Sequence, residues 1–179
     1  MQSQKVKTIA RLGMLFALAM ALSFFESLVT PLLGLMPAMK LGLANIVVMY
    51  ALVFMRRRQA LALVLLKAGF SFLVRGATAG FLSLCGGVLS WTVLCVLLSL
   101  PFPVTGYIFS VCGALAHNVG QLAGASLVLS SAMALGYAPV LLAVGLVVGS
   151  LTCWVARGVF PVLEHLYPEG DARKKKIIF

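Results

Sequence analysis

The stretch that decides the fold runs from Val104 to Ser130 and reads VTGYIFSVCGALAHNVGQLAGASLVLS. It carries no charged residue, and as a helix rising 1.5 Å per residue it is long enough to cross the roughly 30 Å core of a bilayer. Its middle holds an imidazole and two amides, at His117, Asn118 and Gln121. A polar side chain at that depth is costly unless it has a partner. We therefore interpret these three residues as a candidate binding site.

The composition of the whole chain indicates an integral membrane protein. Of its 179 residues, 62% are hydrophobic and only 10% are charged, whereas soluble domains carry roughly 25% charged residues. The net charge is +10, but the basic residues separate apolar runs instead of covering a polar face. We therefore expect no nucleic-acid partner. The four cysteines lie in apolar segments without Cys-x-x-Cys spacing, which is typical of small hydrophobic side chains and not of a metal site.

Six apolar segments are the candidate transmembrane helices of a single domain. They cover residues 9–29, 41–55, 60–75, 79–100, 104–130 and 138–160, and a basic tail follows at 168–179. The first is too long for the core of a cleaved signal peptide, so we expect it to be retained.

Basic residues fall on alternate sides of these spans. They lie before the first span, at Arg56–Arg58 between the second and third, and at Arg173–Lys176 near the end. By the positive-inside rule both termini are cytoplasmic. The expected fold class is an all-α bundle of six transmembrane helices in a bacterial plasma membrane, with the tail lying on anionic lipid head groups.

In this topology, four more polar residues lie near the outer ends of their spans: Glu26, Lys40, Asn45 and Arg75. Together with the central cluster they predict a substrate cavity that opens outward, with a polar floor, a charged rim and the loop Thr30–Met39 as a lid. Two alternatives stay open. The charged residues could pair with one another at the head groups, and the amides could bridge helices.

Two other features are interpreted from position alone. Lys67 falls near the middle of the third span, so we expect it to face the bundle interior, with no assigned role. Gly13, Ala17 and Ala21 repeat every four residues and form a flat stripe of small side chains. Such a stripe packs closely against another helix, either within the chain or on a partner subunit.

Four strings carry a resemblance to a known family: Glu26-Ser27 followed by Pro31, then Lys40–Ile46 (KLGLANI), Leu82–Gly87 (LSLCGG) and Gly113–Gln121 (GALAHNVGQ). In this order the chain resembles the Gx transporter family, also called heptaprenyl diphosphate synthase component I. That family is similar to the S components of energy-coupling-factor (ECF) transporters, which are bacterial vitamin importers with six helices and cytoplasmic termini.

The resemblance implies a capture subunit that hands a small molecule inward. A transmembrane scaffold subunit and two ATP-binding-cassette (ABC) ATPases would supply the energy. It also implies that the Ala-x-x-x-Ala stripe on the first helix contacts the scaffold, and Ala17 and Ala21 match that stripe.

The second family name implies a different class, a subunit of a prenyl diphosphate synthase. Such enzymes hold magnesium and diphosphate with clustered aspartates, whereas the only aspartate here is Asp171 in the tail. We therefore expect no catalysis, no cofactor and no metal site in this chain. A non-catalytic accessory role in isoprenoid, quinone or flavin-redox metabolism remains the alternative. The substrate could be a vitamin, a nucleobase-like ring or a prenylated precursor.

Overall fold

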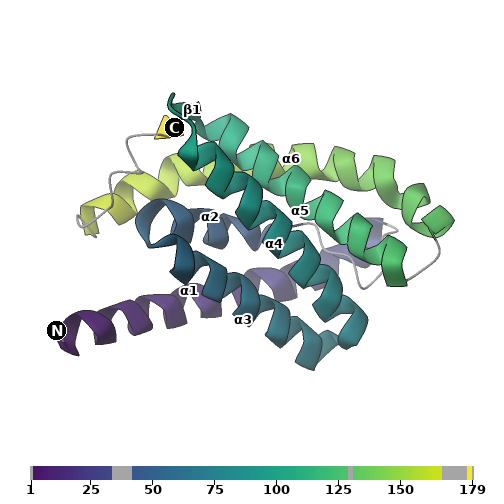
Figure 1. Ribbon diagram of the computed structural model, residues 1–179, viewed down its shortest axis with the longest axis horizontal. Coiled ribbons are helices and arrows are strands. Elements are labelled where there is room, and N and C mark those ends of the chain that lie inside the picture. The colour runs from purple at the N-terminus through teal and green to yellow at the C-terminus, as the bar shows by residue number, and fades with distance from the viewer. Residues whose placement is uncertain (1, 34–41, 129–130, 167–176, 179) are drawn as a thin grey trace.

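The computed structural model of the chain is a bundle of six helices with one short pair of strands (Figure 1). The structure describes residues 2–33, 42–128, 131–166 and 177–178. In chain order the elements are α1 (Gln2–Val29), the short 3-10 helix η1 (Thr30–Leu33), α2 (Asn45–Phe54), α3 (Arg57–Arg75), α4 (Ala77–Ser99), β1 (Val104–Thr105), α5 (Gly106–Val128), α6 (Ser131–Leu166) and β2 (Ile177–Ile178).

Each of the six predicted spans corresponds to one helix, so the prediction of an all-α chain is confirmed. Within the described residues, three helical segments are long and apolar enough to cross a membrane: Val6–Leu32, Ala77–Ser99 and Gly136–Pro161. Charged residues in α3 and the polar cluster in α5 make these two helices less apolar. Membrane crossing by all six helices therefore stays a proposal.

The predicted extent of the second span was wrong. Helix α2 has only 10 residues and begins at Asn45 instead of residue 41. At 1.5 Å per residue it covers about half of a bilayer core. The cause is local, because Gly42 has a φ of +95°, which turns the chain just before the helix.

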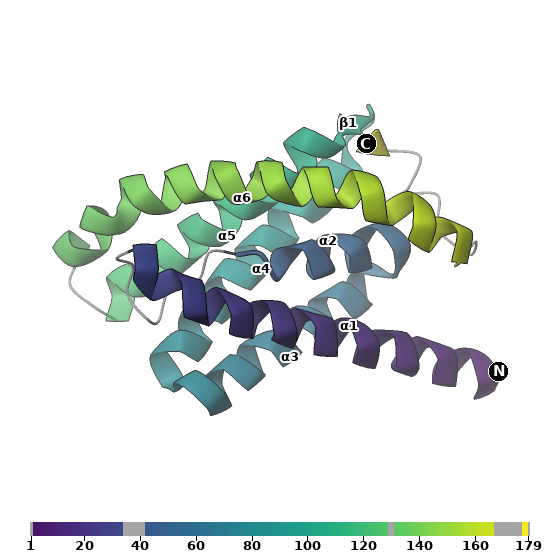
Figure 2. The same ribbon diagram turned by 180° about the vertical axis from the view of Figure 1, so that it is seen from behind.

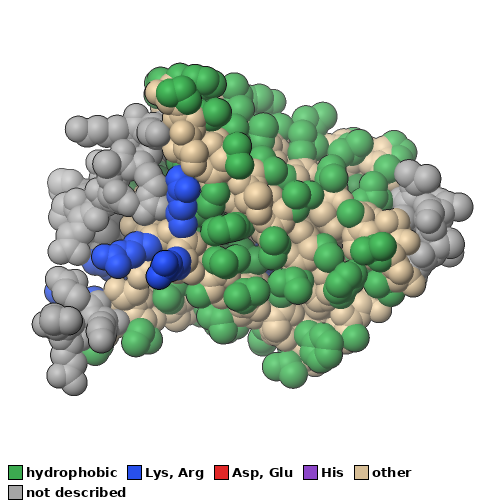
Figure 3. Space-filling model, in the orientation of Figure 1, with side chains coloured by type: hydrophobic (Ala, Val, Ile, Leu, Met, Phe, Trp, Pro, Cys, Tyr) green, Lys and Arg blue, Asp and Glu red, His purple; other side chains and the backbone are tan. Residues whose placement is uncertain are grey.

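The basic residues gather at one end of the bundle. The start of α1, the junction between α2 and α3, and the C-terminal strand β2 all lie toward this end (Figures 1 and 2). Lys and Arg side chains cluster there on the face drawn in Figure 3. Arg57 ties the junction to the end of α4, because its guanidinium donates a 3.0 Å hydrogen bond to Ser99. The predicted alternation of the spans places these residues on one side of a membrane, and that topology stays a proposal.

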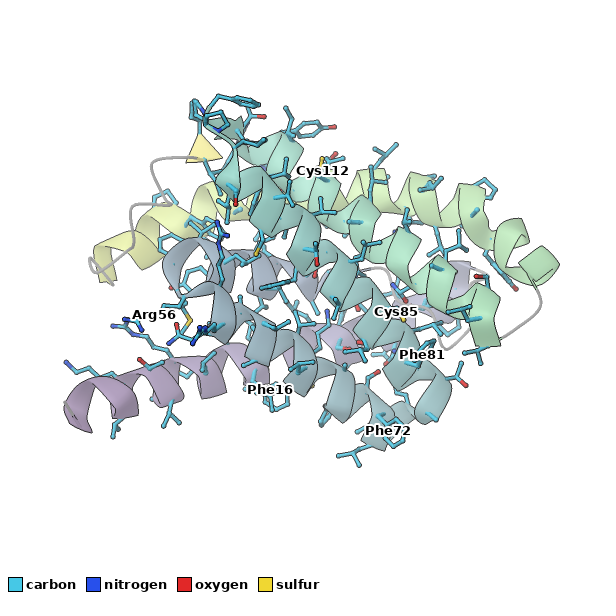
Figure 4. The ribbon with its side chains drawn as sticks, viewed as in Figure 1. Phe16, Arg56, Phe72, Phe81, Cys85 and Cys112 are labelled. Atoms are coloured by element: carbon cyan, nitrogen blue, oxygen red, sulfur yellow. The ribbon has the colours of Figure 1, made fainter. Side chains whose placement is uncertain are left out.

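Glycines bring α4, α5 and α6 into close contact. A Cβ atom on Gly120 of α5 would lie 2.6 Å from the carbonyl oxygen of Cys85 on α4 (Cys85 is labelled in Figure 4). A Cβ atom on Gly149 of α6 would lie 2.7 Å from Cα of Val111 on α5. Small residues allow such close approach of helix backbones. Helix α5 is therefore held between α4 and α6, and its polar residues are carried into the interior.

The strand pair was not predicted from the sequence. Val104 and Thr105, expected at the start of the fifth span, form β1 and pair in parallel with Ile177 and Ile178. Ile177 is buried and belongs to the main hydrophobic core. The C-terminal end of the chain is thus fastened beside the start of α5.

Candidate functional site

Buried polar side chains lie in the interior of the bundle, and most of them lie between its middle and the end away from the basic residues. Glu26 is in the last turn of α1, Asn45 is the first residue of α2, and Arg75 is the last residue of α3. Nine members of this cluster are at most 2% exposed: Glu26, Asn45, Lys67, Ser71, Ser83, Ser90, His117, Asn118 and Gln121. They come from five helices, so the fold gathers polar groups that the sequence scatters over almost a hundred residues.

The polar residues of α5 point in two directions, as their spacing predicts. His117 and Gln121 are one turn apart and face α4, where a Cβ atom on Gly86 would lie 2.9 Å from a side-chain carbon of each. Asn118 faces α6, and its Nδ2 donates a 2.7 Å hydrogen bond to the carbonyl oxygen of Leu141. The expected interhelical bridge is therefore present at Asn118.

The turn before α2 lies against this cluster. A Cβ atom on Gly42 would stand 3.3 Å from Cδ2 of His117 and 3.8 Å from Oδ1 of Asn118. Only glycine fits comfortably here, because the positive φ and the nearby imidazole both disfavour a side chain. The backbone of the turn thus covers the imidazole of His117.

Glu26 joins α1 to this turn and to α3. One of its carboxylate oxygens, Oε1, accepts a 2.9 Å hydrogen bond from the backbone N–H of Ala44. The carboxylate also interacts electrostatically with Lys67 and Arg75. Lys67 is 1% exposed, so the prediction that it faces the interior is confirmed. Glu26 is equally buried, so its carboxylate lies inside the bundle.

Asn45 bridges three helices. Its Nδ2 donates to Oγ of Ser90 on α4 at 2.7 Å and to the carbonyl oxygen of Gly113 on α5 at 3.2 Å. The Ser90 hydroxyl also donates to that carbonyl, at 2.9 Å. The bridging interpretation of Asn45 is therefore what the structure shows. Sequence reasoning missed Ser90, although it lies seven residues after Ser83 and so on the same face of α4.

Several buried atoms of the cluster have no hydrogen-bond partner among the described residues. They include three acceptors, Glu26 Oε2, Asn45 Oδ1 and Asn118 Oδ1, and the hydroxyl of Ser83. Buried polar atoms normally have a partner, because leaving one unsatisfied costs about 1–3 kcal/mol. The cluster thus has more hydrogen-bonding capacity than these helices use.

The stripe on α1 is exposed. Ala17 and Ala21 face outward, and a Cβ atom on Gly13 would meet nothing within 4 Å. Ala19, between the two alanines, is instead fully buried in the core. In the described part of the chain, the stripe is therefore not used for packing within the protein.

Some predicted features lie outside the described residues. They are Lys40, most of the predicted lid and the basic tail at Arg173–Lys176. For the rest, Glu26, Asn45 and the three polar residues of α5 are all buried, and Glu26 and His117 both lie against the turn before α2.

Comparison of the sequence with known proteins identifies its family. The family described as heptaprenyl diphosphate synthase component I matches residues 15–159. The chain belongs to this family. The resemblance inferred from the sequence strings is thus confirmed for the family name. Searches of curated proteins and of solved structures found no match.

The match to heptaprenyl diphosphate synthase component I encloses the whole polar cluster, from Glu26 to Gln121. The family name describes one component of a synthase and so implies a partner component. In the part of the chain that the structure describes, no three His, Cys, Asp or Glu side chains come together as a metal-binding group. None of the four cysteines is in a disulfide, and two of them are buried and two partly buried.

Proposed function

We propose that this protein is the substrate-binding subunit of an ECF-type importer. It captures a small molecule at the outer face of a bacterial plasma membrane and passes it inward, and it carries out no catalysis itself. A transmembrane scaffold and ABC ATPases supply the energy. The observation that carries this proposal is the cluster of buried polar side chains inside an otherwise apolar bundle.

The composition of the cluster favours binding over helix packing alone. Two amides, Asn45 and Asn118, already bridge helices. A bundle held together by such bridges has no need of a buried carboxylate and a buried ammonium as well, because burying charged groups is expensive even when they are paired. Buried ionisable residues in membrane helices are, by default, candidates for functional sites.

The position of the cluster favours capture from outside. Basic residues gather at the opposite end of the bundle, around the junction of α2 and α3, and by the positive-inside rule that end is cytoplasmic. Glu26, Asn45 and Arg75 then lie toward the outer face. If all six helices span, a ligand reaches His117 and Gln121 from outside.

The exposed stripe on α1 favours a partner in the membrane. Gly13, Ala17 and Ala21 offer a flat surface on which another helix can pack at short range, and they are not covered by other described residues of this chain. We propose this stripe as the surface that contacts the scaffold subunit.

A second function is favoured by the family name. As a heptaprenyl diphosphate synthase component I, the protein would be a non-catalytic membrane partner of a prenyl diphosphate synthase, or an accessory subunit in quinone or flavin-redox metabolism. The sequence contains a single aspartate, Asp171, so in this function the magnesium-binding carboxylates come from the other component.

Affinity purification of the tagged protein from its native membranes tests the two functions. Under the first, a transmembrane scaffold and two ABC ATPases purify with it, and ATP stimulates uptake of the bound molecule into vesicles. Recovery of a prenyl synthase or redox subunit in place of the ATPases would reject the importer and establish the accessory role.

A further inference from the structure

Three buried oxygen atoms of the cluster specify what the ligand must offer. They are Oε2 of Glu26, Oδ1 of Asn45 and Oδ1 of Asn118, each on a side chain at most 2% exposed. None has a hydrogen-bond partner among the described residues. Carboxylate and amide oxygens accept hydrogen bonds, so all three positions call for a donor.

The two amides are held in this orientation. Nδ2 of Asn45 donates to the carbonyl oxygen of Gly113, and Nδ2 of Asn118 donates to that of Leu141. Turning either amide by 180° would remove these bonds and place its oxygen against a carbonyl oxygen. The site therefore presents acceptors and cannot exchange them for donors at little cost.

The three acceptors surround one short segment of backbone. The other oxygen of Glu26 is bound to the N–H of Ala44, and Oδ1 of Asn118 lies 3.8 Å from the Cβ position of Gly42. Asn45 ends the same turn. The side chains that carry the three acceptors therefore all neighbour the same turn.

The charge of the cluster disfavours a metal ion, although oxygen atoms are also ligands of hard cations. Arg75 and Lys67 both interact electrostatically with Glu26, and an arginine stays protonated under all ordinary conditions. The carboxylate thus already has a cationic neighbour, and a metal ion would add positive charge next to it. A neutral or anionic molecule would add no positive charge.

We infer that the molecule bound at this site presents at least two N–H or O–H donors and is neutral or anionic overall. Nucleobase-like rings and amide-bearing vitamins have this chemistry. An ionised diphosphate and a quinone offer only acceptors at their polar ends and so do not match these three oxygen atoms. The inference rests on the proposed binding function and narrows it to one class of substrate.

The test uses the full-length protein in lipid nanodiscs after its endogenous small molecules have been washed out. Three probes are applied separately: the protein-free small-molecule fraction of a bacterial cell extract, magnesium or calcium chloride alone, and farnesyl diphosphate alone. Retained molecules are released and weighed by mass spectrometry in water and in D2O, which counts their exchangeable N–H and O–H hydrogens. We expect the extract to supply a molecule with at least two such hydrogens.

The variant Glu26→Gln reverses the hydrogen-bonding character of one position. Its amide oxygen can keep the bond from Ala44, and its NH2 group replaces the open acceptor with a donor. Retention of a donor-bearing molecule should fall roughly tenfold or more, whereas retention of farnesyl diphosphate should rise. Ser27→Ala, on the same helix, is the matched control and should retain as much as the wild type.

The outcomes separate the two proposals. If a molecule is retained that has no exchangeable hydrogen, or if Glu26→Gln strengthens its retention, the protein binds a ligand but the inferred class is wrong. Binding of the metal salt or the diphosphate alone would overturn the class in the same way. If the folded wild type retains nothing from any probe, the binding function itself fails, and the inferred class with it.

Discussion

The carboxylate of Glu26 accepts a 2.9 Å hydrogen bond from the backbone N–H of Ala44, which couples the end of α1 to the turn that precedes α2. The same turn presses Gly42 against the imidazole of His117. One short backbone segment therefore links the charged and the uncharged parts of the polar cluster. A change in the turn should alter the position of both Glu26 and His117.

Substituting Gly42 with alanine should weaken both folding and binding. The residue has a φ of +95°, and a Cβ atom would stand 3.3 Å from the imidazole, so we expect a loss of about 1–2 kcal/mol in the free energy of unfolding and a lower retention of ligand. Gly76 is a matched control, because its φ is +89° but a Cβ atom there meets nothing within 4 Å. Gly76→Ala should destabilise the protein and leave retention unchanged. Equal retention by the two variants would contradict the placement of Gly42 at the site.

His117→Ala and Gln121→Leu should each reduce ligand retention roughly tenfold, because each removes buried hydrogen-bonding groups from the proposed floor of the cavity. Equilibrium dialysis or native mass spectrometry of the purified variants measures the change. Val119→Ala is the control, since Val119 lies on the same helix and is 44% exposed. Wild-type affinity in both cluster variants would mean that these residues only connect helices.

The hydrogen bond between Asn45 and Ser90 should be measurable by a double-mutant cycle. The two side chains are 2.7 Å apart, and interhelical hydrogen bonds in membranes contribute about 1 kcal/mol. Asn45→Leu and Ser90→Ala should each destabilise the protein, and the double variant should be less destabilised than the sum by about that amount. Denaturant titration in mixed micelles provides the free energies. Strict additivity would show that the bridge contributes nothing.

Ala17→Leu combined with Ala21→Leu should abolish co-purification of the partner subunit without unfolding the protein. Both residues are exposed, so the larger side chains meet no other described part of the chain, but they prevent close approach of a second helix. Ala123→Leu makes the same change at an exposed position of α5 and should leave the complex intact. Normal recovery of the partner by the double variant would exclude the stripe as the docking surface.

Local sequence patterns were sufficient for the helices and for part of the site. Long apolar runs predict helices wherever they occur, because a chain in lipid must satisfy its own backbone, and all six were found. The four-residue spacing of His117 and Gln121 correctly predicted that they share a face of α5, and the structure directs that face at α4. The predicted alternation of the spans also places Glu26, Asn45 and Arg75 at one membrane face, and that stays a prediction.

Contacts between distant residues were decided only by the tertiary structure. Asn45 bonds to residues 45 and 68 positions further along the chain, and no local pattern specifies such partners. The late start of α2 depends on the turn at Gly42, and the short strand pair joins Val104 to Ile177. The orientation of the open acceptors likewise depends on the carbonyl that each amide meets on another helix. The hydrophobicity of each residue can be read directly from the sequence. The direction of a hydrogen bond depends instead on how the packed helices face one another.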